Sequence, residues 1–488
     1  MKRVAWNSLS ETERRLALAR PAAVSAPGTD DRGTGDRGTR SGGIEASVRT
    51  IVSDVKQRGN EAARKCSLAL DGFGGPIEPV PESAFDRAWE SLDADLHAAL
   101  DVAFESVRRF HEAQVPRAIS VETSPGIVCR RLTRPIRNIG LYVPAGRAPL
   151  PSTVVMLGVP SLIAGNPNRT VCTPPRADGS VDPAVLVAAR KCGLSTVFPL
   201  GGAQAIAAMA YGTETVGKSD KIFGPGNRYV DAAKRFVSID PDGAAIDLPA
   251  GPSELMIIAD ETANASFVAA DLLAQAEHDV VAHVLLVTTS ATFADQVDAE
   301  LRELLDALPQ PQTAATALAS GCSIIVAGID EAIAVANQYA PEHLIVVTRD
   351  DESIIDHIET AGSVFAGMWT PAALGDYCSG TNHVLPTGGF ARAYSGLSVE
   401  SFLRFMTVQI ATQSGLEHIG PIAATLARAE GLTAHKRSVE IRFANAGGST
   451  VEDGSSNGRE NAMASLRRAL PTTIVPTAVD DLAPGRDQ

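Results

Sequence analysis

The sequence has few aromatic residues, no paired cysteines and no long apolar run. Its six cysteines are scattered over 488 residues without a C-x-x-C pair, which argues against a disulfide framework or a cysteine zinc site and predicts reduced thiols. No apolar run approaches the roughly 18 residues that a membrane helix needs. The N-terminus is polar and charged and lacks the apolar core of a signal peptide. We therefore expect a cytoplasmic protein with no membrane partner.

The sequence also lacks a dense run of basic residues. It has 43 Lys and Arg against 57 Asp and Glu, and its formal net charge is −14. A nucleic-acid surface needs a face rich in Lys and Arg, so we expect no nucleic-acid partner. This composition favours small molecules, or a second copy of the same chain, as the partners.

The apolar pattern predicts an α/β fold. A chain of 488 residues is too long for one simple core, so two or more units are expected. Two series of strand and helix candidates, starting near residues 137 and 254, alternate in the way that predicts parallel sheets. The predicted strands are 139–143, 169–173, 196–199, 221–223, 255–259, 284–288, 322–327 and 344–347. The predicted helices are 44–70, 82–114, 183–191, 204–211, 267–278, 291–307, 329–339 and 417–443.

These patterns suggest an organisation with two Rossmann-like parallel-sheet domains and small helical terminal segments. Stretches rich in Gly, Asp and Ser with few apolar residues are expected to be a linker and a disordered tail. The predicted parts are a helical N-terminal segment (1–20, capped by Ser8 or Ser10), a flexible linker (21–43), a first α/β domain (44–140 and 253–397), a second α/β domain (141–252), a helical C-terminal segment (398–446) and a disordered tail (447–488).

Glycine-containing motifs are candidates for nucleotide binding. The stretch Gly33–Gly38 matches G-x-G-x-x-G, but the residues before it cannot form the strand that this motif requires, so we assign it to the linker. Gly201-Gly202-Ala203-Gln204 and Gly224-Pro225-Gly226-Asn227 each follow a predicted strand and precede a helical pattern. Their placement fits a nucleotide crevice, and it also fits ordinary strand–helix turns.

Three separated segments carry side chains suited to metal binding. Gln275 and His278 are three residues apart on a predicted helix and therefore share a face. Asp376 lies in a polar loop at residues 375–383, and His435 lies on the closing helix near Glu430. One Gln, two His and one Asp form a mixed nitrogen and oxygen set that suits zinc. Taken singly, each of these residues also fits a cap, a core edge or the surface.

A Glu–His pair precedes the last strand of the second series. Glu342 and His343 are adjacent, and such a pair at the mouth of a sheet is typical of acid–base chemistry. The alternative is a solvated pair in a loop. Together with the metal candidates, the pair predicts a metal site beside an acid–base group.

Several ordered motifs resemble the histidinol dehydrogenase family, over roughly residues 44–446. The motifs are Val143-Pro144, Gly201–Ala208, Ile222–Asn227, Pro249–Glu254, Leu273–His278, Ala340–Leu344, Gly375–Tyr377 with Gly380–Pro386, and Leu432–His435. The chain departs from the family at Ala145-Gly146-Arg147, where two glycines usually follow Val-Pro, and at Cys378, where alanine is common.

The resemblance implies a role for each matching residue. The implied zinc ligands are Gln275, His278, Asp376 and His435; the acid–base pair is Glu342 and His343; the substrate contacts are Ser253, Glu430, His343 and the zinc ligands; the NAD contacts are Tyr142, Gln204 and Asn227. Zinc and the catalytic residues would lie in the first α/β domain, and NAD in the second, an incomplete Rossmann-like domain. One zinc per chain and two NAD per turnover would serve the four-electron oxidation of L-histidinol to L-histidine through a bound aldehyde, at the end of histidine biosynthesis. The family also implies a homodimer in which Glu430 and His435 serve the partner's site.

Three alternatives remain at this point. A related NAD-dependent dehydrogenase would act on another amino or sulfonated alcohol, although the Glu430 carboxylate would repel a sulfonate. A zinc hydrolase would use Glu342 to activate water. An inactive scaffold would not need the intact pair and ligand set that this sequence has.

Overall fold

The computed structural model describes the chain except for residues 22–39, 146–147, 250 and 447–488. It forms two compact units, the first made of residues 1–118 and 132–406 and the second of residues 119–131 and 407–488. The predicted tail, the Gly33–Gly38 motif and most of the predicted linker lie outside the described residues. No helix in the described ranges is both long and apolar enough to cross a membrane.

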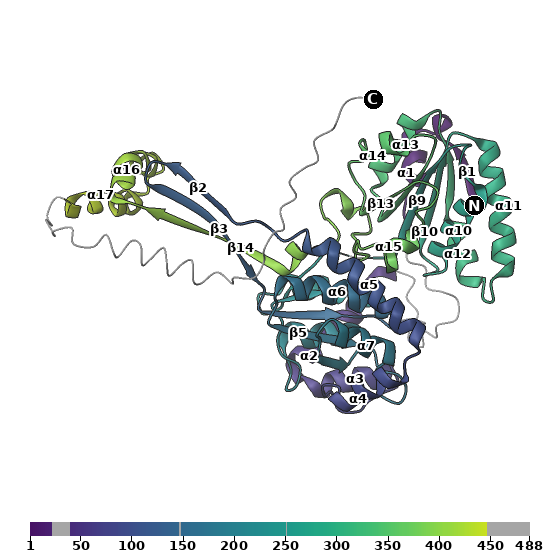
Figure 1. Ribbon diagram of the computed structural model, residues 1–488, viewed down its shortest axis with the longest axis horizontal. Coiled ribbons are helices and arrows are strands. Elements are labelled where there is room, and N and C mark those ends of the chain that lie inside the picture. Colours follow the sequence, from purple (N-terminus) through teal and green to yellow (C-terminus); the bar gives the residue numbers. More distant parts are fainter. Residues whose placement is uncertain (22–39, 146–147, 250, 447–488) are drawn as a thin grey trace, which may run out of the picture. The chain divides into compact units, whose positions relative to one another are not determined.

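One parallel sheet of the first unit has six strands, and helices cover both of its faces (Figure 1). Its order is β1 (Lys2–Ala5), β11 (Cys322–Ile325), β10 (His283–Thr288), β9 (Glu254–Ala259), β12 (His343–Val347) and β13 (Ser363–Ala366). The helices around it are α1 (Glu11–Ala17), α10 (Ala265–Ala276), α11 (Ala291–Ala307), α12 (Gln312–Ser320), α13 (Ile329–Tyr339) and α14 (Asp351–Ile355).

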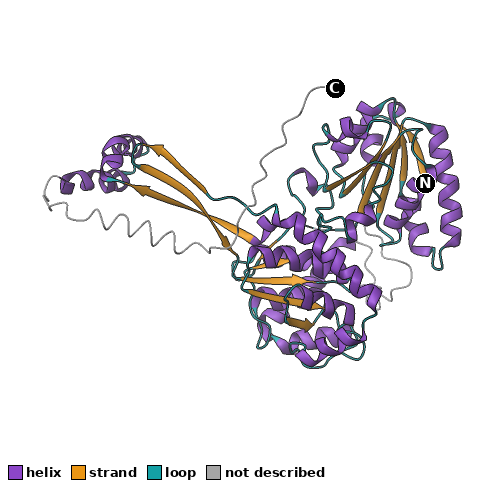
Figure 2. Ribbon diagram, viewed as in Figure 1, coloured by secondary structure: helices purple, strands orange, loops and turns teal. Residues whose placement is uncertain are grey.

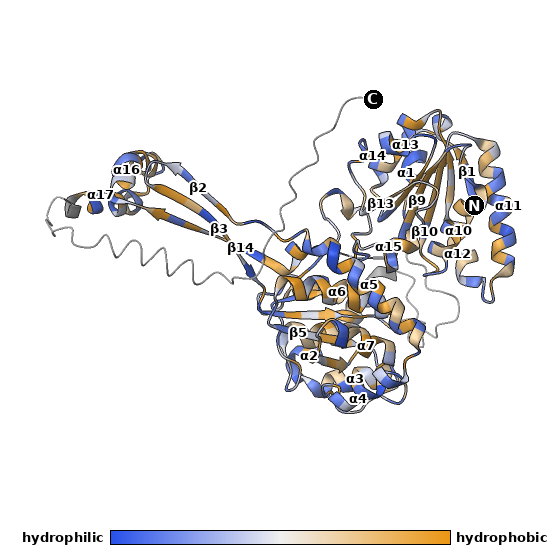
Figure 3. Cartoon of the chain, viewed as in Figure 1, coloured by the Kyte–Doolittle hydropathy of each residue, from blue (hydrophilic) through white to orange (hydrophobic). Residues whose placement is uncertain are grey.

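The sequence of β9 shows why this sheet is buried on both sides. Alternate side chains of a strand point to opposite faces. Leu255 and Ile257 belong to the core cluster that contains α10, α11 and α12. Met256 and Ile258 belong to the cluster that contains residues of α1 and α13. The central strands are therefore apolar at successive positions, as parallel strands buried on both faces require (Figure 3).

A second parallel sheet of the first unit has five strands (Figure 2). Its order is β6 (Thr196–Pro199), β5 (Asn168–Thr173), β4 (Asn138–Tyr142), β7 (Lys221–Phe223) and β8 (Ala245–Ile246). Its helices are α2 (Arg40–Arg58), α3 (Asn60–Leu70), α4 (Glu82–Ser91), α5 (Ala94–Glu112), α6 (Pro151–Ala164), α7 (Pro183–Lys191), α8 (Gly202–Tyr211) and α9 (Arg228–Ile239). The two parallel sheets with their helices confirm the predicted α/β class.

Helices α2 to α5 pack around the five-stranded sheet, whereas the sequence prediction grouped residues 44–140 with the sheet of residues 253–397. Helix α2 contacts α8 and α9, α4 contacts α7, and α5 contacts α6. Val48, Val52 and Val55 form the apolar stripe of α2, and they are buried in one cluster with residues of α8. Such a stripe predicts that a helix packs on a core, but it does not say on which one.

The N-terminal segment is only partly helical. Its first residues form β1, which pairs in parallel with β11. The turn η1 (Trp6–Ser8) follows, and α1 then begins after Ser10, whose side chain forms a capping box with Glu13. The predicted cap at Ser10 is confirmed. The strand was missed because four mostly exposed edge residues show no alternation of apolar and polar side chains.

The second unit contains most of a three-stranded sheet and two helices. The sheet order is β14 (Leu403–Ala411), β3 (Ile127–Pro135) and β2 (Ile119–Ser124). The helices are α16 (Gln413–Ala429) and α17 (Thr433–Ala446), so the predicted helix at 417–443 is confirmed as two helices with a break between them. The predicted helical part 398–446 also contains β14, a strand whose residues are mostly exposed and whose alternation of apolar and polar side chains is not continuous. The remaining elements are α15 (Ala372–Tyr377), η2 (Phe390–Arg392) and η3 (Val399–Phe402) of the first unit.

The core of the six-stranded sheet holds a neutral histidine. His283 on β10 is 2% exposed, and its Nδ1 lies 2.8 Å from the Tyr339 hydroxyl. Burial and the nearby positive charge of Arg20 lower the pKa of His283 to about 4. Protonation of this residue is therefore coupled to unfolding.

We predict that His283→Gln reduces the loss of stability on acidification. A histidine in the unfolded chain has a pKa near 6.5, so between pH ~6.5 and ~4 the unfolded state binds a proton that the folded state does not. At about 1.4 kcal/mol per pKa unit, this coupling amounts to about 3 kcal/mol across the window. Urea unfolding at pH 7 and at pH 4.5 should show a smaller decrease for the variant than for the wild type. The exposed His357→Gln is the control, and an unchanged decrease in His283→Gln would contradict the prediction.

Candidate functional site

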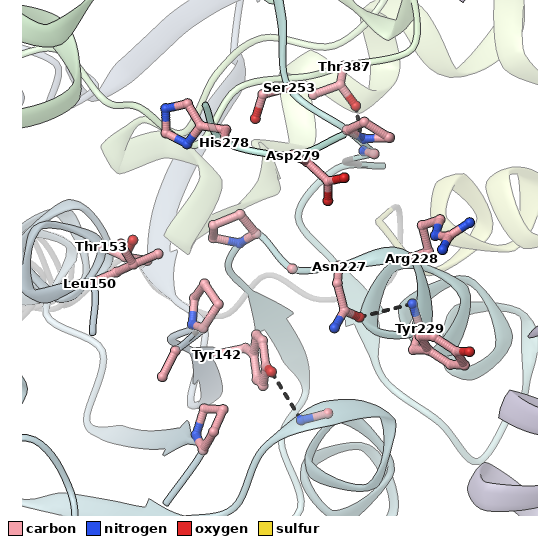
Figure 4. A pocket seen from close by; sticks show the side chains of 18 of the residues that line it. Tyr142, Leu150, Thr153, Asn227, Arg228, Tyr229, Ser253, His278, Asp279 and Thr387 are labelled. Carbon is pink, nitrogen blue, oxygen red and sulfur yellow. Dashed lines mark hydrogen bonds between the residues drawn. The ribbon is translucent and has the colours of Figure 1, made fainter. Parts of the chain in front are cut away.

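One pocket of about 780 Å³ in the first unit brings together most of the predicted site residues. The predicted residues that line it are Tyr142, Gln204, Asn227, Ser253, Gln275, His278, Glu342, His343 and Asp376. Figure 4 shows Ser253 and His278 on one side of the open space and Tyr142 and Asn227 on the other. The volume is within the range of small-molecule pockets. Glu430 and His435 belong to the second unit, where both are exposed, and they do not line this pocket.

The predicted acid–base pair lies at the start of β12. A left-handed residue, Ala340 (φ 54°), ends α13, and the chain then enters the strand. Glu342 is 6% and His343 is 5% exposed, so the alternative of a solvated loop pair is wrong. The Glu342 Oε2 atom accepts a hydrogen bond of 2.8 Å from the main-chain N–H of Glu254. The Nδ1 atom of His343 lies 3.2 Å from the main-chain oxygen of Glu254.

The second ring nitrogen of His343 is directed towards Asp376. Its Nε2 lies 3.6 Å from Asp376 Oδ1 and has no hydrogen-bond partner in the part of the chain that the structure describes. Burial opposes a charged imidazole, but the carboxylates of Glu342 and Asp376 outweigh burial and raise the pKa of His343 to about 10. A cation bound at Asp376 would oppose this charge, so the protonation of His343 depends on what Asp376 binds.

Three of the four residues predicted to bind zinc come from two helix ends. Gln275 lies in the last turn of α10 and is 6% exposed, and His278 follows the end of that helix. Asp376 lies on the short helix α15, where the sequence suggested a loop. Burial acts to raise the pKa of Asp376, but the nearby imidazole of His343 and the charges of His383 and His278 lower it, which favours the carboxylate.

These donors fit a zinc ion in chemistry but do not complete its shell. An amide oxygen, an imidazole and a carboxylate form a set that zinc accepts. Within the described ranges, no group of three or more His, Cys, Asp or Glu is placed to hold a metal. Of the predicted set, only His278 and Asp376 are such residues in this unit, because Gln275 is an amide and His435 belongs to the second unit. Three of the four predicted ligands therefore line this pocket, and the fourth, His435, does not.

The residues predicted to contact NAD lie at the carboxyl ends of the five-stranded sheet. Tyr142 ends β4, and its hydroxyl accepts a hydrogen bond of 3.0 Å from Gly202 N–H (Figure 4). The fully buried Gln204 donates through Nε2 to Asp71 at 3.1 Å, and its Oε1 has no partner among the described residues. Asn227 caps α9 by accepting from the N–H of Tyr229 and of Val230, and among the described residues its amide nitrogen has no hydrogen-bond partner, so it can donate to a ligand's oxygen.

The glycine turn after β7 is tightly constrained. Gly224 has φ 118°, and a Cβ there would overlap with the main-chain oxygen of Tyr142. The N–H of Gly224 donates to Asp247, and its carbonyl accepts from the buried Lys234 ammonium, each at 2.8 Å. Both predicted glycine turns follow strands and precede helices, as expected. Nucleotide binding by these turns stays a prediction.

Sequence reasoning gave no role to several polar residues around the pocket. His383 lines it, with Nδ1 2.8 Å from the Asp376 main-chain oxygen and Nε2 3.2 Å from the Thr153 hydroxyl. Glu254 contacts both members of the acid–base pair through its main chain. Its position directly after Ser253 in a matched motif was the only signal for it in the sequence.

Known proteins resemble this chain over most of its length. A family model described as histidinol dehydrogenase matches residues 36–443. Histidinol dehydrogenase of Xanthomonas euvesicatoria pv. vesicatoria (strain 85-10) is 48% identical over 443 residues, which cover 91% of this chain and 99% of that protein. The histidinol dehydrogenase of Vibrio parahaemolyticus serotype O3:K6 (strain RIMD 2210633) is 46% identical over 442 residues, with 91% and 98% covered. The crystal structure of histidinol dehydrogenase from Elizabethkingia anophelis is similar with a TM-score of 0.84 and 40% identity, covering 92% of this chain and 99% of that chain.

Proposed function

This chain belongs to the histidinol dehydrogenase family, and on that premise we propose that it oxidises L-histidinol to L-histidine with zinc and NAD. The proposal depends on one observation: a single cavity is lined by all three groups of predicted residues. They are the NAD contacts Tyr142, Gln204 and Asn227, the zinc ligands Gln275, His278 and Asp376, and the acid–base pair Glu342 and His343. A dinucleotide and a metal-held substrate would share this space.

The cofactors supply what the side chains cannot. Zinc, held by Gln275, His278 and Asp376 together with His435 of the partner subunit, would anchor the imidazole and amine of the substrate, and two NAD molecules would in turn accept one hydride each. Holding the reacting carbon in place in this way can supply a large part of the barrier reduction. The buried oxygen of Gln204, which has no hydrogen-bond partner in the described ranges, supports a polar ligand on the NAD side.

The proton transfers belong to the buried pair. When a cation bound at Asp376 keeps His343 neutral, its Nδ1–H points at the main-chain oxygen of Glu254, and Nε2 is then the base that takes the hydroxyl proton of the alcohol. Glu342 then takes a proton from the water that adds to the bound aldehyde. Retention of the aldehyde between the two steps keeps a reactive carbonyl from solution.

The decisive experiment is NADH production with L-histidinol, with and without a strong chelator. We expect NADH to form with L-histidinol and NAD, to disappear on chelation and to return with zinc. Metal analysis should find about one zinc per chain. A fully active preparation without metal would refute the zinc proposal. If a substrate is converted without formation of NADH, a zinc hydrolase is favoured. If NADH forms only with an alcohol other than L-histidinol, a related dehydrogenase is favoured.

We predict that substitution of the pair separates the two half-reactions. Glu342→Gln should slow aldehyde oxidation far more than alcohol oxidation, because only the second step needs an activated water. His343→Asn should impair both steps, and losing such a group typically costs about 10²–10⁴-fold in rate. Stopped-flow NADH formation from each substrate measures this, with the exposed Glu359→Gln as control. Equal slowing of both steps by Glu342→Gln would rule out the assigned role.

We further propose a homodimer with shared active sites, in which Glu430 and His435 serve the partner's pocket. Two inactive variants, His278→Ala and His435→Ala, are unfolded and refolded together. In a mixed dimer one site then collects both defects and the other has none, so roughly a quarter of all sites should recover activity. The matched control mixes His278→Ala with Asp376→Ala, where every site keeps a defect. Absence of recovery in the first mixture would show that His435 serves its own chain.

A further inference from the structure

The main chain of one residue, Glu254, holds both members of the buried acid–base pair. Its N–H donates to Glu342 Oε2 at 2.8 Å, and its carbonyl oxygen lies 3.2 Å from Nδ1 of His343. A displacement of Glu254 therefore moves both groups together. It also changes which nitrogen of His343 carries the proton, because the tautomer depends on that carbonyl.

The side chain of Glu254 is anchored in a buried place. It is 3% exposed, and a buried carboxylate is stable only with good partners. One carboxylate oxygen accepts from the Gly388 N–H at 2.8 Å. The guanidinium of Arg20 pairs with both oxygens, from Nη2 at 2.8 Å and from Nε. A bidentate pair of this kind fixes orientation as well as charge.

Arg20 also contacts the end of α13, which lies just before Glu342 and His343 in the chain. Its guanidinium lies over the Tyr339 ring, 4.0 Å from the centroid, and donates to the Tyr339 main-chain oxygen at 3.0 Å. Tyr339 is the last residue of α13, three positions before Glu342. One side chain thus ties together the start of β9 and the approach to β12.

We infer that Arg20, acting through Glu254, is a positioning residue for Glu342 and His343. The inference rests on the proposed role of that pair in L-histidinol oxidation. It gives the N-terminal segment, which has no matched motif, a part in catalysis. Arg20 is not among the residues that line the pocket, and its side chain is 27% exposed, so its replacement removes no apolar side chain from the core.

The test is steady-state and half-reaction kinetics of Arg20→Met in the full-length holoenzyme. We expect kcat to fall by about 10–100-fold in both half-reactions, since small misplacements of reacting groups cost this much. The KM for L-histidinol, the KM for NAD and the zinc content should stay within about threefold, because the hydrogen bonds of Arg20 and Glu254 among the described residues do not reach the proposed zinc ligands or NAD contacts. Arg20→Lys should recover part of kcat, and so should guanidinium chloride at non-denaturing concentration, because either restores a cation beside Glu254.

Two further variants separate positioning from general stability. Arg392→Met is the matched control: Arg392 donates to the main-chain oxygens of Gly389 and Gln338 and reaches that of Tyr339, but no hydrogen bond joins it to Glu254, so kcat should stay near wild type. Glu254→Gln should lower kcat as Arg20→Met does. The double variant should be no slower than the slower single variant, because both act on one interaction.

The outcomes distinguish this inference from the proposed function. If the wild-type protein does not oxidise L-histidinol, the proposed function fails. If the wild type is active and Arg20→Met matches Arg392→Met, the positioning role is wrong. A loss in Arg20→Met that follows its melting temperature, without recovery by lysine or guanidinium, would show a merely structural role and also overturn the inference.

Discussion

The pairing of β12 with β9 determines where the candidate chemistry lies. The two strands run in parallel, with His343 opposite Leu255. This register brings Glu342 and His343 against the main chain of Glu254, whose N–H and carbonyl hold them. A shift by one residue would turn the apolar side chains of the strand towards the other face, so the packing that buries the sheet also holds the pair in place.

Much of the fold follows from sequence periodicity. The predicted strand at 196–199 and the predicted helix at 291–307 agree with β6 and α11 in both bounds, because Gly, Ser or Pro residues close to both ends mark the limits of each pattern. Strand β2 was missed because it is almost wholly exposed and has only a weak apolar pattern. The helical character of residues 44–70 and 82–114 was predicted, but a stripe of valines does not indicate on which of two cores a helix packs.

Most of the predicted site residues line one pocket, but the geometry of that pocket could not be predicted. Nothing in the spacing shows that Tyr142 and Asp376 face one cavity, and the resemblance to a family supplied that link. Sequence reasoning assigned no role to Arg20 and Glu254, because both act on the pair through main-chain atoms at the start of β9. Such contacts leave no pattern of side chains in the sequence, since any residue has an N–H and a carbonyl at that position.

The two sheets present opposite ends to the pocket. On the five-stranded side, the amino ends of α8 and α9 follow the strands and border the cavity, as they do in nucleotide-binding sheets. On the six-stranded side, the pocket instead meets the carboxyl end of α10, at Gln275 and His278, and the amino end of β12, which follows the carboxyl end of α13. Helix dipoles place partial positive charge at amino ends and partial negative charge at carboxyl ends. The cavity is therefore electrically polarised by its backbone alone, with one wall that attracts anions such as a pyrophosphate and an opposite wall that attracts cations.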